Sequence, residues 1–558
     1  MDLTKEWYKF YERNVPAEIE QISKALPDVI DETAKASPGK TILYSLGKKL
    51  KYKELINDVN RFASGLIQLG IKKGDRICLL LPNLIQFPVA HLAILRVGAI
   101  SVPVNPLLTT FEIGKVIGLC EPRMLIVLAD FYHKVREFRK NTSVEKIIVT
   151  GAVDYSPQLI RILYKIKPGV RPPVIDDPDI LSFNKLVKSI NSPKEFPLVS
   201  PDDTAVLLST GGINGVLKLA ELTHRNITSN AVQIMHWVSG SRGKDDSVLG
   251  VIPLFHSFGI TLCLHFCLLA GVKLILLPRF NVKKVLKTIK RFRINFFPGV
   301  PAMFSSLLDH RINDKSVFSS LKFCLSGGDV LNNELLVQFE QKTGVKIIDS
   351  YGLTEASPAA ISNPLLGLRK TESIGIPLSS TLAMVADPET GKPLPAGVTG
   401  ELAIKGPQVM KGYWKNQEET SLVIKDNWLF TGDRARMDKD NYLFLEGRFK
   451  KLIIHCGFNV FPAEVEIVLK KHPSVKKVKV IGKKEKNHGE SVMAYIVPAG
   501  EHGIKEKELK DYCRKFLAGF KVPGHFKFVS DLQEFGNAES SPPGMNPEND
   551  VEINFKNL

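Results

Sequence analysis

A glycine-rich segment with a single lysine is the first stretch of this chain whose residue types could do chemistry. Directly after a predicted buried strand at 204–209 come Thr210, Gly211, Gly212, Ile213, Asn214, Gly215, Val216, Leu217 and Lys218. The bare backbone N–H groups of glycines can approach the oxygens of a polyphosphate, and the lysine adds positive charge. The Gly-Lys-Ser/Thr ending of a Walker loop is absent. We therefore predict a phosphate site of another type.

Three polar segments farther along the chain have residue types suited to the rest of a nucleotide. They are Tyr351-Gly352-Leu353-Thr354-Glu355, Thr431-Gly432-Asp433 and Gly447-Arg448-Phe449-Lys450. Taken alone, the first two are more often plain turns. In the same way, His256 alone is more often a packed core histidine and Lys450 a surface lysine. Only the combination of these segments favours a site.

The order of these segments resembles the AMP-forming acyl-CoA synthetase and luciferase superfamily, and within it the long-chain fatty-acid–CoA ligases. Seven further motifs carry the resemblance: Leu222-Thr-His-Arg-Asn226, Pro253-Leu-Phe-His-Ser-Phe-Gly259, Gly299-Val-Pro301, Ser326-Gly-Gly-Asp329, Gly400-Glu-Leu402, Gly412-Tyr-Trp414 and Gly457-Phe-Asn-Val-Phe-Pro-Ala-Glu-Val465. Each motif is weak alone. With the glycine-rich segment, Tyr351–Glu355 and Thr431–Asp433, these seven make ten motifs in the family's order over roughly residues 30 to 530, which is not expected by chance.

The resemblance implies a site for ATP and magnesium. Glu355 would bind the Mg²⁺ that bridges the ATP phosphates, since a hard cation prefers oxygen ligands, and Thr354 would contact the α-phosphate. Asp433 would accept hydrogen bonds from the ribose hydroxyls, with Arg448 as their basic partner. The remaining contacts to the nucleotide would come from Thr210, Gly211, Gly212, Gly215, Lys218, Gly327, Gly328, Tyr351 and Gly352.

The resemblance also implies a route for an acyl group and for coenzyme A. His256 resembles an aromatic gate beside the acyl carboxylate, and Gly299–Pro301 resembles part of the acyl tunnel wall. Gly457 would let the pantetheine arm pass close to the backbone, and Lys450 falls at the family's hinge position. We expect Thr354, Glu355, Lys218 and His256 to be catalytic, with ATP, Mg²⁺ and coenzyme A as the cofactors.

The phosphate segment departs from the family pattern at two places. The family carries two adjacent hydroxyl residues before the second glycine, whereas this chain has Ile213 and Asn214, and Lys218 is followed by Leu219 instead of glycine. A hydrogen bond to a charged group is worth ~1.5–3 kcal/mol. We expect weaker handling of pyrophosphate, partly compensated by Asn214 and Lys218.

A second departure lies near the end of the sequence, where the family places a Gly-Lys pair used in adenylation. Residues 530–555 contain no lysine or arginine, and their turn-rich, acidic composition is that of a flexible tail. Removing one preorganised charge from a transition state costs roughly 10²–10³ in rate. Lys521 and Lys527 lie upstream, and neither is assigned the missing role.

The pattern along the chain predicts an α/β fold. Helical and buried-strand patterns alternate between 52 and 106 and again between 272 and 325, which indicates largely parallel sheets covered by helices. Short strands between Gly and Pro turns at about 374–445 predict a β-rich subdomain. We expect an N-terminal domain at 1–447 and a mobile α+β domain at 448–558, with a surface excursion at 154–200.

Composition restricts the partners of the chain. Its 558 residues carry 75 Lys and Arg against 58 Asp and Glu, a net charge of +17, which favours anionic partners such as nucleotides, coenzyme A or acidic lipid surfaces. No nucleic-acid-binding signature accompanies the charge.

The seven cysteines read as reduced thiols, and no signal peptide is recognisable. We therefore expect a cytoplasmic protein, and peripheral membrane contact stays open.

Two functions remain open from the sequence. The first is an acyl-CoA synthetase that activates a medium- or long-chain acid in two steps. The second is a catalytically impaired homologue that binds nucleotide or acyl ligand without efficient adenylation. The oligomeric state and the identity of the acid are not specified by the sequence.

Overall fold

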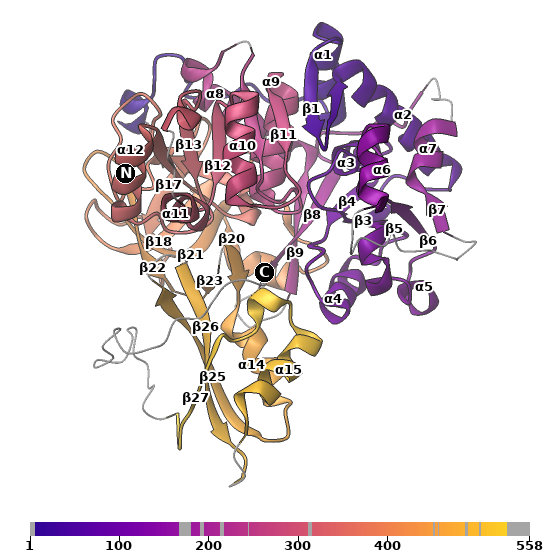
Figure 1. The fold of residues 1–558 in the computed structure, drawn as a ribbon. Helices are drawn as coiled ribbons and strands as arrows, with labels where there is room; N and C mark the ends of the chain where they lie inside the picture. Colours follow the sequence, from indigo (N-terminus) through magenta and orange to yellow (C-terminus); the bar gives the residue numbers. More distant parts are fainter. Residues whose placement is uncertain are drawn as a thin grey trace.

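The computed structural model describes residues 6–166, 180–189, 195–211, 217–243, 245–310, 315–449, 452–455, 457–485, 489–500 and 504–532. Lys450, Gly212, Ile213, Asn214 and Gly215 lie outside the described residues, as does most of the lysine-free segment. The described residues form a large upper body and a small lower body (Figure 1).

Two large sheets build the upper body. The eight-stranded sheet has the order β19 (Gly412–Tyr413), β9 (Leu217–Thr223), β8 (Thr204–Gly211), β4 (Ile100–Pro103), β3 (Arg76–Leu80), β5 (Met124–Leu128), β6 (Lys146–Thr150) and β7 (Ile180–Ser182). The nine-stranded sheet has the order β16 (Ile376–Pro377), β15 (Ala359–Ser362), β14 (Lys346–Gly352), β13 (Phe323–Ser326), β12 (Phe296–Gly299), β10 (Ser247–Gly250), β11 (Lys273–Leu276), β1 (Thr41–Ser45) and β2 (Lys48–Lys51). Strands in the middle of both sheets are parallel, which confirms the predicted α/β class.

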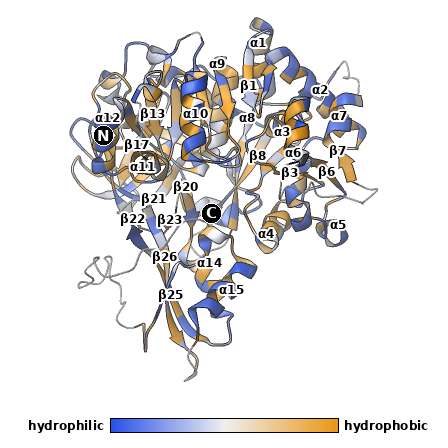
Figure 2. Cartoon of the chain, in the orientation of Figure 1, coloured by the Kyte–Doolittle hydropathy of each residue, from blue (hydrophilic) through white to orange (hydrophobic). Residues whose placement is uncertain are grey.

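Helices between and around the sheets supply the shared core. Phe62 of α2 (Tyr52–Gln68), Phe87 of α3 (Gln86–Arg96), Ile227 of α8 (His224–Trp237) and Leu268 of α9 (Phe266–Ala270) belong to one buried cluster that reaches strands of both sheets. Truncating such a phenylalanine to alanine costs about 3–5 kcal/mol. In Figure 2 the outer helices α2 and α15 carry both colours, as expected for helices with one buried face.

The remaining helices of the upper body were only partly anticipated from the sequence. They are α1 (Leu26–Ala36), α4 (Thr110–Cys120), α5 (Phe138–Asn141), α6 (Gln158–Ile166), α7 (Phe183–Ser189), α10 (Val282–Phe292), α11 (Pro301–Asp309), α12 (Asn333–Thr343) and α13 (Gln417–Val423). The prediction of a surface excursion at 154–200 was incomplete. Its described part adds β7 to the edge of a sheet and packs α7 against α2.

A smaller sheet lies between the two bodies. It has the order β17 (Leu382–Ala386), β18 (Gly400–Lys405), β21 (Trp428–Met437) and β20 (Ile424–Lys425), and β22 (Leu443–Arg448) pairs with β21. The lower body contains β23 (Ile453–His455), β24 (Phe458–Val460), β25 (Val475–Glu485), β26 (Gly489–Pro498) and β27 (His525–Phe528), with helices α14 (Pro462–Lys470) and α15 (Glu506–Phe516). The division of the chain after residue 447 stays a prediction.

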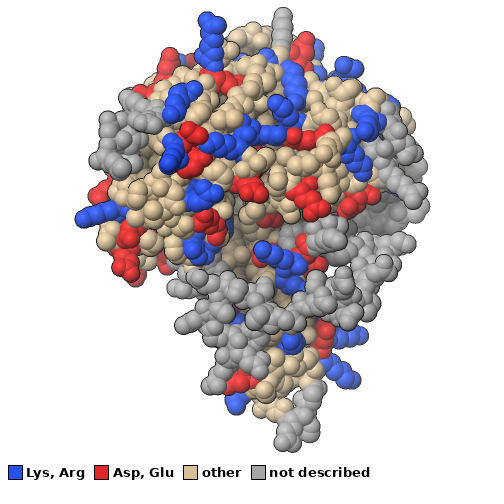
Figure 3. Space-filling view, turned by 90° about the vertical axis from the view of Figure 1, so that its left-hand side faces the viewer, with Lys and Arg blue, Asp and Glu red and all other residues tan. Residues whose placement is uncertain are grey.

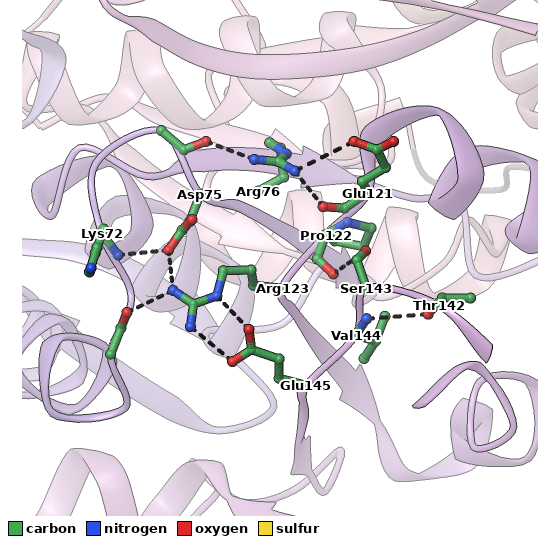
Figure 4. Close-up of polar contacts among 12 residues, drawn as sticks. Lys72, Asp75, Arg76, Glu121, Pro122, Arg123, Thr142, Ser143, Val144 and Glu145 are labelled. Carbon is green, nitrogen blue, oxygen red and sulfur yellow. Dashed lines mark hydrogen bonds and ion pairs between the residues drawn. The ribbon is translucent and has the colours of Figure 1, made fainter. Parts of the chain in front are cut away.

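Arginines fix the amino ends of three parallel strands (Figure 4). Arg123, just before β5, donates to Asp75 at 2.8 Å and forms a two-point contact with Glu145 at 2.8 and 2.9 Å. Arg76 at the start of β3 donates to the carbonyl oxygens of Cys120 and Glu121, each at 2.7 Å. The opposite, carboxyl ends of these strands lead toward the cavity described below, as is usual in open α/β sheets.

Figure 3 shows Lys and Arg interspersed with Asp and Glu over the large part of the face in view. Within the described ranges, no helix has the length and apolar character needed to cross a bilayer.

Candidate active site

One large cavity lies where the upper body, the small sheet and the lower body meet. It has a volume of about 2250 Å³. The described residues predicted to bind nucleotide or coenzyme A or to be catalytic line it: Thr210, Gly211, Lys218, His256, Gly327, Gly328, Tyr351, Gly352, Thr354, Glu355, Asp433, Arg448 and Gly457. Of the predicted tunnel wall, Val300 and Pro301 line it and Gly299 does not. Gly212 and Gly215 lie outside the described residues. Motifs separated by up to 247 positions, from Thr210 to Gly457, thus face the same space.

At one end of the cavity, Asp433 has partners on both carboxylate oxygens. Tyr351, near the end of β14, donates its hydroxyl hydrogen to Oδ2 over 2.5 Å. Arg448 of β22 lies 2.6 Å from Oδ1, because β21 and β22 pair these two residues directly. Burial and the neighbouring carboxylate raise the pKa of Tyr351, so the phenol stays a donor. A carboxylate held in this way is suited to accept further hydrogen bonds from a diol.

Glu355 stands at a second polar centre. Its Oε1 accepts a hydrogen bond from Thr210 Oγ1 at 3.1 Å and another from Tyr413 hydroxyl at 3.0 Å, and the residue is only 8% exposed. The neighbouring Thr354 lies with its Oγ1 3.3 Å from Ser257 Oγ. One carboxylate among hydroxyls fits Mg²⁺, which takes one or two protein carboxylates together with substrate phosphates. No group of three His, Cys, Asp or Glu able to hold a metal occurs in the described ranges, so such an ion would depend on the phosphates.

Lys218 was expected in a loop, but it is the second residue of β9, an antiparallel partner of β8. Its ammonium group forms a buried ion pair with Glu419 of α13 and lies 4.7 Å from the centre of the Tyr413 ring. The side chain therefore lines the cavity while its charge is held by Glu419. Tyr413 links this pair to Glu355.

Backbone geometry explains why Gly352 and Gly328 of the predicted adenine slot are glycines. A Cβ atom at Gly352 would lie 2.2 Å from the carbonyl oxygen of Pro358, so no larger residue fits. Gly328 has a φ of +81°, a conformation that favours glycine. At Gly327 a Cβ would stand 3.3 Å from the carbonyl oxygen of Ser350, a tight but smaller conflict.

A third region of the cavity is apolar and begins at His256. Burial lowers the pKa of His256 to about 4, so its ring is neutral near pH 7. Apolar side chains of α8, of the π-helical segment Gly259–His265, of β13 and of α11 with the residue before it also line the cavity: Ile234, Trp237, Leu262, Leu325, Val300 and Met303. Neutral surroundings of this kind suit the hydrocarbon part of a ligand.

The β23–β24 hairpin of the lower body reaches this same region. Gly457, at φ +80°, lies so close to Val300 that a Cβ would stand 3.1 Å from Val300 Cγ2. The adjacent Phe458 stacks on Phe520 with ring centres 4.5 Å apart, and its ring centre is 5.8 Å from that of His256. Phe461 packs directly against Gly211 of the phosphate segment.

Several residues of the site were not predicted. Tyr413 belongs to a motif that was noted without a role, and Glu419 stands only six positions later; their importance appears once β19 pairs with β9. Asp349 and Asp329 also line the cavity, and burial raises their pKa values to about 8 and about 6. Nothing in the local sequence indicates such burial.

Comparisons with known proteins agree with this geometry. Residues 30–414 match the family "AMP-binding enzyme", and residues 464–538 match its "AMP-binding enzyme C-terminal domain". A long-chain-fatty-acid–CoA ligase of Bacillus subtilis is 34% identical over 536 residues, which cover 95% of this chain and 96% of that protein. A probable 4-coumarate–CoA ligase of Dictyostelium discoideum is also 34% identical, over 90% of this chain and 91% of that protein.

Solved structures show the same fold. The o-succinylbenzoate CoA synthetase of Bacillus subtilis, bound to a product analogue, superposes with a TM-score of 0.77 at 26% identity and covers 91% of this chain and 96% of its own. ATP-bound MatB of Rhodopseudomonas palustris gives a TM-score of 0.69 at 28% identity, over 91% of this chain and 95% of its own. With both family domains matched and relatives similar along nearly the whole length, the chain belongs to the AMP-binding enzyme family.

Proposed function

We propose that the protein is an ATP-dependent acyl-CoA synthetase. In the first step, a carboxylate oxygen of the acid attacks the α-phosphorus of ATP and pyrophosphate leaves, which gives an acyl-adenylate. In the second step, the thiol sulfur of coenzyme A attacks the acyl carbon, AMP leaves and the thiol proton passes to solvent. The observation that carries the proposal is the single cavity that joins Asp433, Glu355 and an apolar region.

The roles follow from the contacts around each residue. Asp433, oriented by Tyr351 and Arg448, holds the ribose hydroxyls. Glu355 and the hydroxyl of Thr354 would face the phosphates, and Glu355 would hold a Mg²⁺ ion, which would supply positive charge near the phosphates. His256 borders the acyl carboxylate as a neutral ring. Gly457 has no side chain that would obstruct a thin chain running along the backbone toward the acyl group.

For the acid, we propose a medium or long aliphatic chain. The apolar region is walled by Ile234, Trp237, Leu262 and Met303, with no charged side chain among these four. The relative from Bacillus subtilis, named for long-chain acids, supports this choice. Coenzyme A thioester formation measured across acids of 2 to 18 carbons, with benzoate and coumarate alongside, tests it. Activity confined to aromatic or two-carbon acids would exclude the aliphatic chain.

A second candidate function is favoured by one contact. Lys218 is engaged by Glu419, and Ile213 replaces a hydroxyl residue, and we expect both to slow adenylation. The second candidate is therefore a protein that binds nucleotide or acyl ligand without efficient adenylation. Calorimetry with AMP and acyl-CoA, next to an assay of ATP consumption, separates the two. Tight binding without turnover supports the binding protein, and ATP consumption that depends on coenzyme A supports the synthetase.

We also propose that the protein contacts membranes peripherally through α6. On this helix Leu159, Ile162 and Leu163 are 68%, 49% and 53% exposed, next to the exposed Arg161. The helix contains no acidic residue, and its Tyr164 lines the cavity. An apolar face with basic residues suits a bilayer containing anionic lipid. Sedimentation with phosphatidylglycerol vesicles tests this, and equal sedimentation of a triple glutamine variant at positions 159, 162 and 163 would contradict it.

A further inference from the structure

Lys521 joins the two bodies through a buried cluster of charges. Its ammonium nitrogen lies 2.8 Å from Glu112 Oε1 in the upper body and 2.9 and 3.0 Å from the two carboxylate oxygens of Glu464 in the lower body. The three side chains are 11%, 3% and 15% exposed. Burial lowers the pKa of Lys134, and the nearby carboxylate of Glu112 partly opposes this shift.

Other contacts join the same surfaces around this cluster. Thr109, which caps α4, donates to the carbonyl oxygen of Phe516 at the end of α15 over 3.2 Å. Phe111 and Phe516 meet edge to face with ring centres 5.5 Å apart. Figure 1 shows α4 at the lower margin of the large body, where the lower body with α14 and α15 approaches it.

The cluster lies on the segment that supports the hairpin inside the cavity. Lys521 directly follows Phe520, whose ring stacks on Phe458 of β24, and Phe458 stands beside His256. Glu464 lies in α14, which begins immediately after Phe461, the residue packed on Gly211. The position of Lys521 against Glu112 therefore fixes where Gly457 and Phe458 lie relative to the upper body.

We propose that Lys521 and Glu112 form a latch that positions the Gly457 hairpin in the cavity for transfer of the acyl group to the thiol. The inference rests on the proposed function, which gives the thiol its route past Gly457. Both residues are positioning residues, since neither lies among the groups that line the cavity.

The energetics favour a real restraint rather than a chance surface pair. An exposed ion pair contributes little to stability. If the bodies separated, Lys521 would keep Glu464 within the lower body, but the carboxylate of Glu112 would lose its charged partner, which is unfavourable unless water reaches it. Rotation of the lower body away from the upper body would have to break this contact. The latch also accounts for Lys521 itself, since its charge is committed to two carboxylates and is not offered to the adenylation site.

The chain provides a matched pair of variants for a test. Glu112→Gln removes the charge on the upper-body side, while its amide oxygen can still accept from the backbone of Thr109 and keep the helix cap. Glu464→Gln removes the partner on the lower-body side only, within the same body as Lys521. The two changes are chemically identical, but only the first one breaks the connection between the bodies.

The first readout is independent of activity. Trypsin cleavage at Arg448, Lys450 and Lys451 reports how freely the lower body moves, and fragments are identified by mass. We expect cleavage about tenfold faster in Glu112→Gln, the size expected for loss of one charge-assisted contact, and close to wild type in Glu464→Gln. Equal rates in wild type and Glu112→Gln would overturn the latch. Adding Lys521→Met to Glu112→Gln should cause no further change, and a further large increase would also overturn it.

The second readout uses synthetic octanoyl-AMP with coenzyme A in a single turnover. We expect slower thioester formation in Glu112→Gln than in Glu464→Gln, with an unchanged affinity for AMP. An unchanged transfer rate in Glu112→Gln would overturn the positioning role. If neither the wild type nor any variant forms the thioester, the proposed function is wrong. The cleavage rates then still show whether the latch exists.

Discussion

The hydroxyl of Tyr351 donates to Asp433 across 2.5 Å, joining the end of β14 in the nine-stranded sheet to β21 in the small sheet. The contact links two motifs that stand 82 positions apart. It orients the carboxylate before any ligand arrives, so that little reorganisation is needed on binding.

Replacing Asp433 by alanine should weaken AMP binding by about ten- to one-hundredfold, because a charged acceptor for ribose hydroxyls is worth ~1.5–3 kcal/mol. Titration calorimetry measures the affinity. Asp440→Ala serves as a control, since this carboxylate pairs with Lys370 away from the cavity lining. A similar loss of affinity in both variants would show that the effect is not local.

Replacing Glu355 by glutamine should lower the affinity for ATP in the presence of Mg²⁺ but leave the affinity for AMP nearly unchanged. The substitution keeps hydrogen-bond capacity toward Thr210 and Tyr413 and removes only the charge that a hard cation requires. Binding measured with and without Mg²⁺ tests this. An equal loss for ATP and AMP would contradict a role at the metal.

Replacing Ile213 by threonine should raise the rate of pyrophosphate exchange by about tenfold, because it restores a hydroxyl that can bond to a phosphate. Val216→Thr, in the same segment but outside the altered pair, should have little effect. Exchange of labelled pyrophosphate into ATP is the measurement. No gain in Ile213→Thr would show that adenylation is limited elsewhere.

A buried histidine cluster predicts loss of stability in acid. His91 and His265 contact each other through their Nε2 atoms at 2.9 Å, and burial lowers the pKa of His265 to about 3 and that of His224 to about 4. The unfolded state takes up protons near pH 6.5, whereas these side chains stay neutral in the folded state. Stability should therefore be complete above this pH and fall progressively from about pH 6.5 toward pH 4.

The variant His224→Gln tests this directly. It should show a flatter decrease of melting temperature across that interval than the wild type, as followed by circular dichroism. His133→Gln, at an exposed histidine of the short helix after β5, is the control and should keep the wild-type slope. A slope unchanged by His224→Gln would rule out His224 as a source of the acid sensitivity.

Much of the fold could be predicted because periodic segments are long and regular. The helix expected at 52–69 is α2 at Tyr52–Gln68, and the one expected at 462–471 is α14 at Pro462–Lys470. In both, buried residues recur at helical spacing, so local pattern and tertiary packing agree. The strand β9 was missed because its seven residues are nearly all buried and show no alternation.

Residues that line the cavity could be named from the sequence, but their contacts could not. The motif order predicts roles for Glu355 and Asp433, and both line the cavity, while the roles stay predictions. The engagement of Lys218 by Glu419, 201 positions later, depends on the pairing of β9 with β19. Likewise, Lys521 and Glu112 stand in opposite halves of the chain, and no local pattern connects them.

The contact between Gly211 and Phe461 has a consequence for both proposed half-reactions. A Cβ atom at position 211 would overlap the phenyl ring, so the glycine for which we propose a polyphosphate contact also gives the ring its place. Under the proposed function, even an alanine there should slow both half-reactions. Steady-state kinetics of such a variant would show the defects in the two half-reactions together. A change at this one glycine would therefore act like a change in both the upper and the lower body.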